Sequence, residues 1–180
     1  MEHTCYNIVD LLKKGKHHIR EIADLLGTNH MRVKRELLVL QDKNVVDFNK
    51  EGRNYVYFLK DSLEAKQYIL ISEHYKLLEA SDKKELRKLI CDILSIEDIS
   101  LAIIFGSYAK GEETEESDID LYVESDNRDL KKEIERNNTK ASVKIGRFNP
   151  NSELGREIIK NHVIIRGVER FYELVPEKAG

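Results

Sequence analysis

The chain has 180 residues, of which 41% are hydrophobic and 35% are charged, and its formal net charge is −3. This length allows one large domain or two small ones, and the apolar fraction is sufficient for hydrophobic cores. No apolar run approaches the roughly 20 residues that a membrane-spanning helix needs, so we expect a protein that does not span a membrane and stays in the cytoplasm. Cys5 and Cys91 lack the paired spacing that would indicate a zinc site or a disulfide.

Charge is distributed unevenly along the chain. Residues 1–60 contain 11 Lys and Arg residues against 8 Asp and Glu residues, a net charge of +3, whereas residues 61–180 contain 19 against 25, a net charge of −6. A mildly basic part followed by an acidic part indicates that any nucleic acid would bind to the first 60 residues.

Apolar residues recur at helical spacing in the first 40 residues and predict three short helices. Gly15 and Gly27 end the first and the second helix, and Thr28 or Asn29 can cap the third. His17 and His18 are expected in the turn before the second helix. The apolar positions are, in chain order, Ile8, Leu11 and Leu12; Ile19, Ile22, Leu25 and Leu26; and Val33, Leu37 and Leu40.

Two strands are predicted after the third helix, over residues 45–48 and 55–59, with a polar turn at residues 49–54. Three helices followed by a β-hairpin make a winged helix-turn-helix. Residues 19–40, with the small Ala23 at the helix crossing and Gly27 in the turn, resemble winged-helix transcription regulators.

This resemblance implies that the third helix enters the major groove of double-stranded DNA, with the wing near a backbone phosphate. The alternative is a solvated face used for protein contacts or dimerisation, because a net charge of +3 is modest for a DNA-binding domain. A homodimer would suit a two-fold DNA site. The candidate DNA-binding residues are Asn29, His30, Arg32, Lys34 and Arg35 in the helix, and Lys50 and Arg53 in the wing.

Residues 61–80 form a further helical stretch. Leu63, Leu70 and Leu77 recur every seven residues, but polar residues occupy the intervening core positions, so a connecting helix is favoured over a coiled coil. We therefore expect a winged-helix domain at residues 1–60, a helical linker at 61–81 and a second domain at 82–180.

The second domain contains a pattern that points to chemistry. An apolar run at residues 101–105 is followed by Gly106 and Ser107, and then by Asp118 and Asp120. The run predicts a buried strand and a tight turn that opens a helix, which Ser107 can cap. Asp118 and Asp120 lie two residues apart on the next strand and share a face. A helix start that attracts phosphate beside two acids that can hold Mg²⁺ predicts a metal-bound nucleoside triphosphate and phosphoryl or nucleotidyl transfer.

The motif formed by Gly106, Ser107, Gly111, Ser117, Asp118 and Asp120 resembles that of the nucleotidyltransferase superfamily typified by DNA polymerase beta, most closely its minimal nucleotidyltransferase branch. The resemblance covers roughly residues 82–175 and implies an α+β chain whose C-terminal part is a small mixed sheet flanked by helices. It also implies Mg²⁺ or Mn²⁺ at Asp118 and Asp120, and transfer of a nucleoside monophosphate, often AMP from ATP, to a macromolecular hydroxyl. The nucleotide-binding residues would be Gly106, Ser107, Lys110 and Ser117.

The chain departs from this family at the next strand, where active members usually carry a third carboxylate. Residues 141–148 contain no acid, and Lys144 stands at their centre. Either Asp118 and Asp120 hold one metal and a nucleotide with weak or no turnover, or Glu153 or Glu157 reaches in from the following segment. Lys144 can point at phosphate oxygens or extend to solvent.

Two functional classes therefore stay open for the chain, an enzyme and a catalytically degenerate regulator. Minimal nucleotidyltransferases are often the antitoxin half of toxin–antitoxin pairs, so the resemblance implies a small helical toxin as a possible partner. Further helices are predicted at residues 83–94 and 129–136, then a closing helix within 158–172 with a short strand at 163–165.

Overall fold

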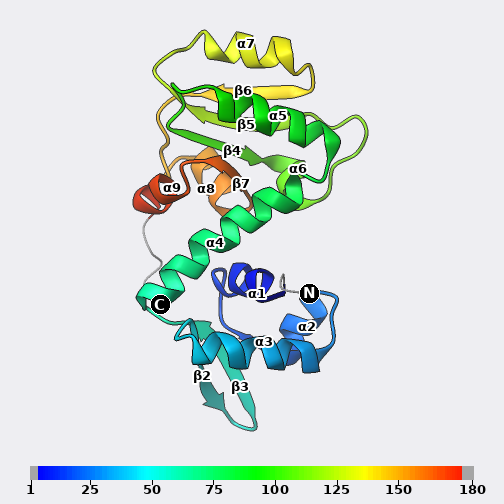
Figure 1. The fold of residues 1–180 in the computed structure, drawn as a ribbon, viewed down its shortest axis with the longest axis vertical. Coiled ribbons are helices and arrows are strands. Elements are labelled where there is room, and N and C mark those ends of the chain that lie inside the picture. The colour runs from blue at the N-terminus through cyan, green and yellow to red at the C-terminus, as the bar shows by residue number, and fades with distance from the viewer. Residues whose placement is uncertain (1–3, 176–180) are drawn as a thin grey trace. The chain divides into compact units, whose positions relative to one another are not determined.

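The computed structural model describes residues 4–175, and the chain forms two compact units, Met1–Tyr75 and Lys76–Gly180. The predicted α+β class is confirmed (Figure 1). The domain boundaries expected at residues 60 and 82 stay predictions, and the division between the units falls inside the helix α4 (Leu63–Ala80). The residues from Pro176 onward, which the sequence suggests are a frayed tail, lie outside the described part.

The N-terminal unit is a winged helix-turn-helix. Its helices α1 (Thr4–Leu12), α2 (Ile19–Leu25) and α3 (His30–Asp42) precede an antiparallel hairpin of β2 (Val46–Glu51) and β3 (Asn54–Leu59). Asn29 caps α3, because its side-chain oxygen accepts a hydrogen bond from the Met31 N–H at 2.7 Å. The sequence leaves the cap open between Thr28 and Asn29. The buried apolar core of the unit consists of Ile8, Val9, Leu12, Ile22, Ala23, Val33, Leu37, Leu40, Val45, Val46, Tyr57 and Ala65.

The predicted core position of Leu25 is wrong, because this side chain is 58% exposed. The stripe that α2 turns toward the core is Ile19, Ile22, Ala23 and Leu26, at spacings of three and four residues. Leu25 lies outside this stripe, so its apolar character does not make it a core residue.

The hairpin is longer, and its turn tighter, than the sequence predicts. Glu51 pairs with Asn54, so only Gly52 and Arg53 form the turn, and Gly52 has a φ of +62°. Lys50 therefore lies in β2 instead of in the turn. Glycine suits the left-handed backbone that a two-residue hairpin turn requires.

His17 and His18 form the short strand β1 (His17–His18), so their predicted place in a turn is wrong. They pair with Tyr57 and Val56 of β3, which gives a three-stranded sheet in the order β1-β3-β2. A two-residue strand has no hydrophobic periodicity, and it forms here because the edge of β3 offers backbone hydrogen-bonding groups that need partners.

A buried ion pair joins α4 to the residue after α1. The Glu73 side chain is completely buried, and its carboxylate accepts a hydrogen bond from the Lys13 ammonium, which also lies 2.8 Å from Asp10 Oδ1. Leu63, a member of the seven-residue repeat, is 71% exposed. The packed side of α4 thus includes Glu73, where the sequence indicated a polar interruption.

Replacing Lys13 with alanine is expected to destabilise the N-terminal unit by about 3–5 kcal/mol, because the buried Glu73 carboxylate loses the positive charge of Lys13. Urea unfolding would measure this change. Lys34→Ala, at an exposed position of α3, serves as the control and should change stability by no more than about 0.5 kcal/mol. A Lys13→Met/Glu73→Leu pair should recover most of the loss, whereas equal stability of Lys13→Ala and wild type would contradict the role of the ion pair.

The C-terminal unit is built on a four-stranded mixed sheet in the order β6-β5-β4-β7. The strands are β4 (Leu101–Phe105), β5 (Ile119–Glu124), β6 (Ala141–Ile145) and β7 (Val163–Arg166). β4 is antiparallel to both β5 and β7, and β5 is parallel to β6. This arrangement is the small mixed sheet flanked by helices that the sequence predicted.

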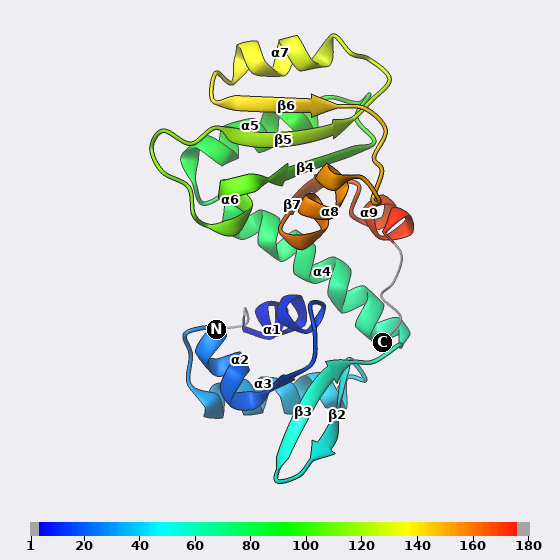
Figure 2. The ribbon, with the colours of Figure 1, turned by 180° about the vertical axis from the view of Figure 1, so that it is seen from behind.

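Helices cover both faces of this sheet (Figures 1 and 2). α5 (Lys84–Ser95) and α7 (Leu130–Asn137) share one apolar core with the sheet. α8 (Glu153–Lys160) and α9 (Val168–Leu174) lie on the opposite face, where the Tyr122 and Phe148 rings are 5.5 Å apart and Arg170 pairs with Glu124 at 2.7 Å. The core on the α5 side includes Leu86, Leu89, Ile90, Ile93, Ala102, Ile104, Ile119, Leu121, Val123, Leu130, Ile134 and Val143.

The predicted closing helix within residues 158–172 is wrong in its bounds, because the chain forms two helices with β7 between them. Gly167 makes the turn from β7 into α9 with a φ of +81°, and a Cβ there would lie 2.4 Å from the Ser100 carbonyl oxygen. A glycine is therefore needed where the backbone passes so close to its neighbour.

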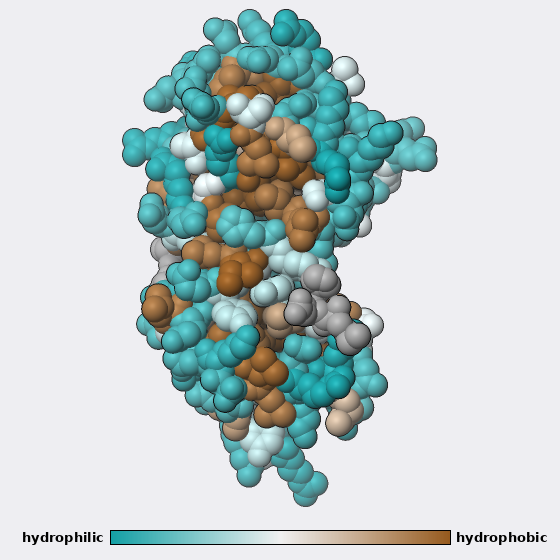
Figure 3. Space-filling model, in the orientation of Figure 1, coloured by the Kyte–Doolittle hydropathy of each residue, from teal (hydrophilic) through white to brown (hydrophobic). Residues whose placement is uncertain are grey.

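Hydrophilic side chains cover much of each unit in the view of Figure 3, with apolar areas between them. Within residues 4–175, no helix combines the length and the apolar character that a bilayer crossing requires.

Candidate functional site

The predicted motif begins with a strand, a tight turn and a short helix that follow one another directly. β4 ends at Phe105, the chain turns at Gly106 with a φ of +69°, and the short helix α6 (Gly106–Lys110) follows. Asp120 pairs with Phe105 across the two strands. A Cβ at Gly106 would lie only 2.3 Å from Asp120 Oδ2, so the carboxylate lies directly against the backbone of the turn.

This close approach predicts different effects of alanine at two glycines that have nearly the same backbone angle. Gly106→Ala is expected to cost at least about 2 kcal/mol more than Gly111→Ala and to displace the Asp120 carboxylate. Gly111 has a φ of +71° and nothing within 4 Å of the position of an added Cβ. Alanine at this position therefore costs only the free energy of placing a non-glycine residue in the left-handed region. Urea unfolding of the two variants measures the difference, and equal destabilisation would contradict the close approach.

The surroundings of Asp120 disfavour its charged form. Partial burial raises its pKa, the negative charges of Glu157 and Asp118 raise it further, and only Lys144 acts in the opposite sense. Asp118 is exposed and lies just before β5, which begins at Ile119, so the predicted place of Asp118 on this strand is wrong. A cation bound between these carboxylates would relieve their mutual repulsion, so the residues fit the divalent metal that the sequence predicts.

Asp120 lies on the sheet face that α8 and α9 cover. Its neighbours Ile119 and Leu121 belong to the core on the α5 side, so Asp120 points to the other side. α8 packs against β4 on that side, and Glu157 belongs to α8. The negative charge of Glu157, one of the two acids considered as substitutes, raises the pKa of Asp120.

The register of β5 and β6 identifies the strand position nearest Asp120. That position is Ser142, which pairs with Asp120, while Lys144 pairs with Tyr122 one pleat further along. Both residues share the face of Asp120 because paired residues of adjacent strands point to the same side. Ser142 therefore occupies the β6 position from which an acid would reach the candidate metal site.

Asp118 and Asp120 are the candidate metal ligands among the described residues. Among residues 4–175, no group of three or more His, Cys, Asp or Glu side chains is arranged to hold a metal ion. Asp118 and Asp120 suit Mg²⁺ or Mn²⁺ that takes its remaining ligands from water and substrate phosphates.

The other predicted nucleotide-binding residues have separate positions. Phe105 is the N-cap of α6, so the predicted capping role of Ser107 is wrong, and α6 has only five residues, too few for a strong helix dipole. The Ser117 hydroxyl accepts the Thr114 N–H at 2.9 Å and so closes the loop before Asp118. Lys110 is exposed at the last turn of α6.

Tyr108, which the sequence reasoning passed over, anchors the motif. Its ring is 6% exposed in the core of the unit, and its hydroxyl donates to Glu85 Oε2 of α5 at 3.0 Å. Burial, followed by the hydrogen bond to Glu85, raises the pKa of Tyr108. In the sequence, only the position of Tyr108 between Gly106 and Gly111 indicates that it anchors the motif.

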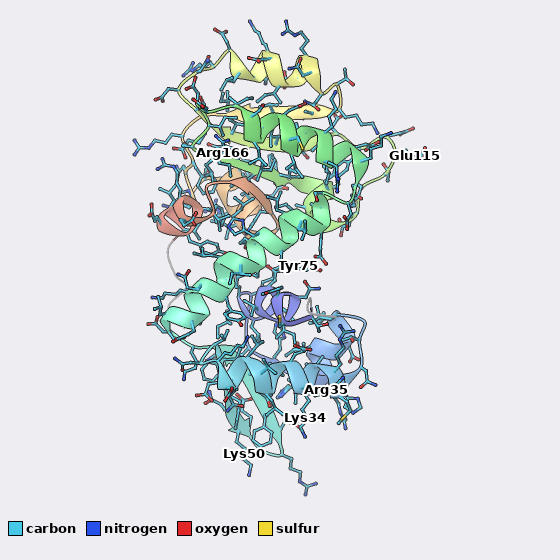
Figure 4. All side chains as sticks on the ribbon, in the orientation of Figure 1. Lys34, Arg35, Lys50, Tyr75, Glu115 and Arg166 are labelled. Atoms are coloured by element: carbon cyan, nitrogen blue, oxygen red, sulfur yellow. The ribbon has the colours of Figure 1, made fainter. Side chains whose placement is uncertain are left out.

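The exposed side of α3 carries both basic and apolar residues. Lys34 and Arg35 are exposed on α3, and Lys50 projects from the hairpin of the same unit (Figure 4). Arg32 is half-buried, and Asn29 is engaged in capping α3. Met31 and Leu38, which the sequence did not single out, are 55% and 53% exposed on this side.

A polar hollow lies beside the start of α3. Arg20 of α2, another residue that the sequence reasoning did not select, borders it with Asn29 and His30. Arg53 is exposed in the hairpin turn. The structure thus places the predicted DNA-binding residues on α3, at its N-cap and in the hairpin, with Arg20, Met31 and Leu38 near the start or on the exposed side of α3.

The family model of the polymerase beta nucleotidyltransferases matches residues 88–169, which contain the whole candidate metal site. No curated protein matches the chain at a significant level.

Three solved structures illustrate the likeness to known folds. Lactococcus lactis ZitR is 17% identical, covering 53% of this chain and 71% of its own, with a TM-score of 0.37. The adhesin competence repressor AdcR from Streptococcus pyogenes is 14% identical, covering 53% and 78%, with a TM-score of 0.39. RosR from H. salinarum is 20% identical, covering 53% and 91%, with a TM-score of 0.37. These TM-scores are too low to support a fold assignment, so the winged-helix assignment depends on the helices and the hairpin of the N-terminal unit itself.

Proposed function

We propose that the C-terminal unit binds a metal–nucleoside triphosphate and transfers nucleoside monophosphate slowly to a macromolecular hydroxyl, while the winged helix binds double-stranded DNA. The observation that carries this proposal is the Asp120 carboxylate against the Gly106 turn, within a segment that matches the nucleotidyltransferase family model. The family resemblance favours ATP and transfer of AMP.

Each group at the site has a defined task in this reaction. Asp118 and Asp120 would hold the cation, and the Gly106–Ser107 turn and Lys110 would bind the phosphates. The acceptor oxygen attacks the α-phosphorus, the new O–P bond forms, the bond to the β-phosphate oxygen breaks, and pyrophosphate leaves with the electron pair. A carboxylate on β6 could accept the acceptor proton, but Ser142 occupies that position. The proton therefore passes to solvent water. When bound, Mg²⁺ or Mn²⁺ would neutralise charge on the phosphate oxygens.

The DNA-binding part of the proposal is supported by the exposed Lys34 and Arg35 on α3, by Lys50 and Arg53 in the hairpin, and by the net charge of +3 in residues 1–60. Arginine and lysine on a recognition helix contact base edges and phosphates. A homodimer that reads a two-fold site and a cytoplasmic location are both compatible with this role.

A labelling assay tests the enzymatic part. The full chain is incubated with each of four nucleoside triphosphates labelled at the α-phosphate, with Mg²⁺ or Mn²⁺ and protein or nucleic-acid acceptors. We expect slow, metal-dependent transfer of label, with pyrophosphate released in equal amount. Absence of both products with all four nucleotides would reject the enzyme.

The second candidate is a regulator without turnover, and the serine in place of an acid at position 142 favours it. In this case, nucleotide would bind at the same acids and change the affinity for DNA or for a protein partner. By resemblance, that partner would be a small helical toxin. Nucleotide-dependent DNA affinity without pyrophosphate release would support the regulator over the enzyme.

A further inference from the structure

We propose that Lys144 supplies a fixed positive charge in place of a second metal ion, so that the acid site binds one divalent cation together with a triphosphate. This inference depends on the proposed nucleotide binding and identifies how the site manages without an acid on β6. It assigns to Lys144 a positioning role toward phosphate oxygens.

The geometry of the sheet places Lys144 on the correct side. β6 runs parallel to β5, and Lys144 is two residues beyond Ser142, the partner of Asp120. Residues two apart on a strand share a face, so Lys144 and Asp120 project from the same side of the sheet. Lys144 is exposed, and its long side chain has the freedom to direct the ammonium toward a ligand at the acids.

The charges around Asp120 are available to a ligand. None of the ion pairs found in residues 4–175 involves Asp118, Asp120, Lys144 or Glu157. Lys144 nevertheless lies near enough to act electrostatically on Asp120, as do Glu157 and Asp118. The ammonium is therefore close to the acids without being committed to one of them.

The residues of β6 then favour a single cation. A second divalent ion on the β6 side would meet the ammonium of Lys144 and would find Ser142 where a carboxylate ligand is needed. The same ammonium can pair with the phosphate oxygens that a second metal would otherwise hold.

Counting bound manganese tests the inference. Electron paramagnetic resonance measures Mn²⁺ bound to the full chain in the presence of a non-hydrolysable ATP analogue with a methylene bridge between the α- and β-phosphates. We expect one ion per wild-type chain, two in a Ser142→Asp/Lys144→Glu variant, and one in the control Lys132→Glu, an exposed position on α7.

A second variant protects the test against a folding failure of the first. Lys144→Ala should bind the analogue about tenfold or more weakly than wild type, since it removes a charge-assisted hydrogen bond to phosphate. Two ions in wild type, or an unchanged affinity in Lys144→Ala, would overturn the role of Lys144 and leave nucleotide binding intact. No manganese bound with the analogue by wild type would overturn both proposals.

Discussion

Replacing both Asp118 and Asp120 with asparagine is expected to lower metal-dependent nucleotide binding and any transfer of label by at least about 100-fold, because these are the two proposed metal ligands and Asp120 lies against the Gly106 turn. The substitution keeps the shape of both side chains and removes their charge. Equilibrium dialysis with Mn²⁺ and labelled ATP measures binding, and pyrophosphate release measures turnover.

The matched control is Asp98→Asn/Asp126→Asn, which removes the same charge from two exposed positions. It should bind nucleotide like wild type. Equal binding by the control and the Asp118→Asn/Asp120→Asn variant would show that the acid pair is not the metal site.

The same double variant should be more stable than wild type in the absence of metal. Since the pKa of Asp120 is raised above its ordinary value, its ionised form weakens the folded state at neutral pH, and an uncharged asparagine removes this penalty. A metal-free variant that unfolds at lower urea concentration than wild type would contradict this account of the site's electrostatics.

Replacing Lys34 and Arg35 with alanine is expected to weaken duplex binding and to reduce the slope of log affinity against log salt by about 2, close to one unit for each phosphate that is no longer neutralised. Both residues are exposed on α3, so their replacement should leave the fold intact. Fluorescence anisotropy with a labelled duplex, repeated from roughly 50 to 200 mM salt, measures the slope.

The control for charge is Lys132→Ala/Arg136→Ala, which removes two exposed positive charges from α7 in the other unit. If both variants bind duplex with the wild-type salt dependence, α3 does not contact DNA. A decrease in affinity that is equal in the two variants would indicate a general effect of net charge.

The amino-acid sequence by itself determined the candidate metal site, since its signals are local. An apolar run and a glycine specify a strand and a tight turn through backbone geometry alone, and the alternation of side chains along β5 places Asp120 on the face opposite Ile119 and Leu121. Helical periodicity in the first 40 residues likewise determined the three helices of the winged unit, whereas Leu25 shows that apolar character does not decide which side of a helix is packed.

Only the tertiary structure decided which residues surround Asp120. Ser142 and Glu157 lie 22 and 37 residues beyond it, and their approach depends on strand register and on how α8 packs against the sheet. The buried Glu73 and Lys13 pair for the same reason, because a lysine that neutralises a buried carboxylate can come from any segment that folding brings near. Such pairings are set by the free energy of the whole packed unit, and a charged residue in a sequence carries no mark of the partner it will meet.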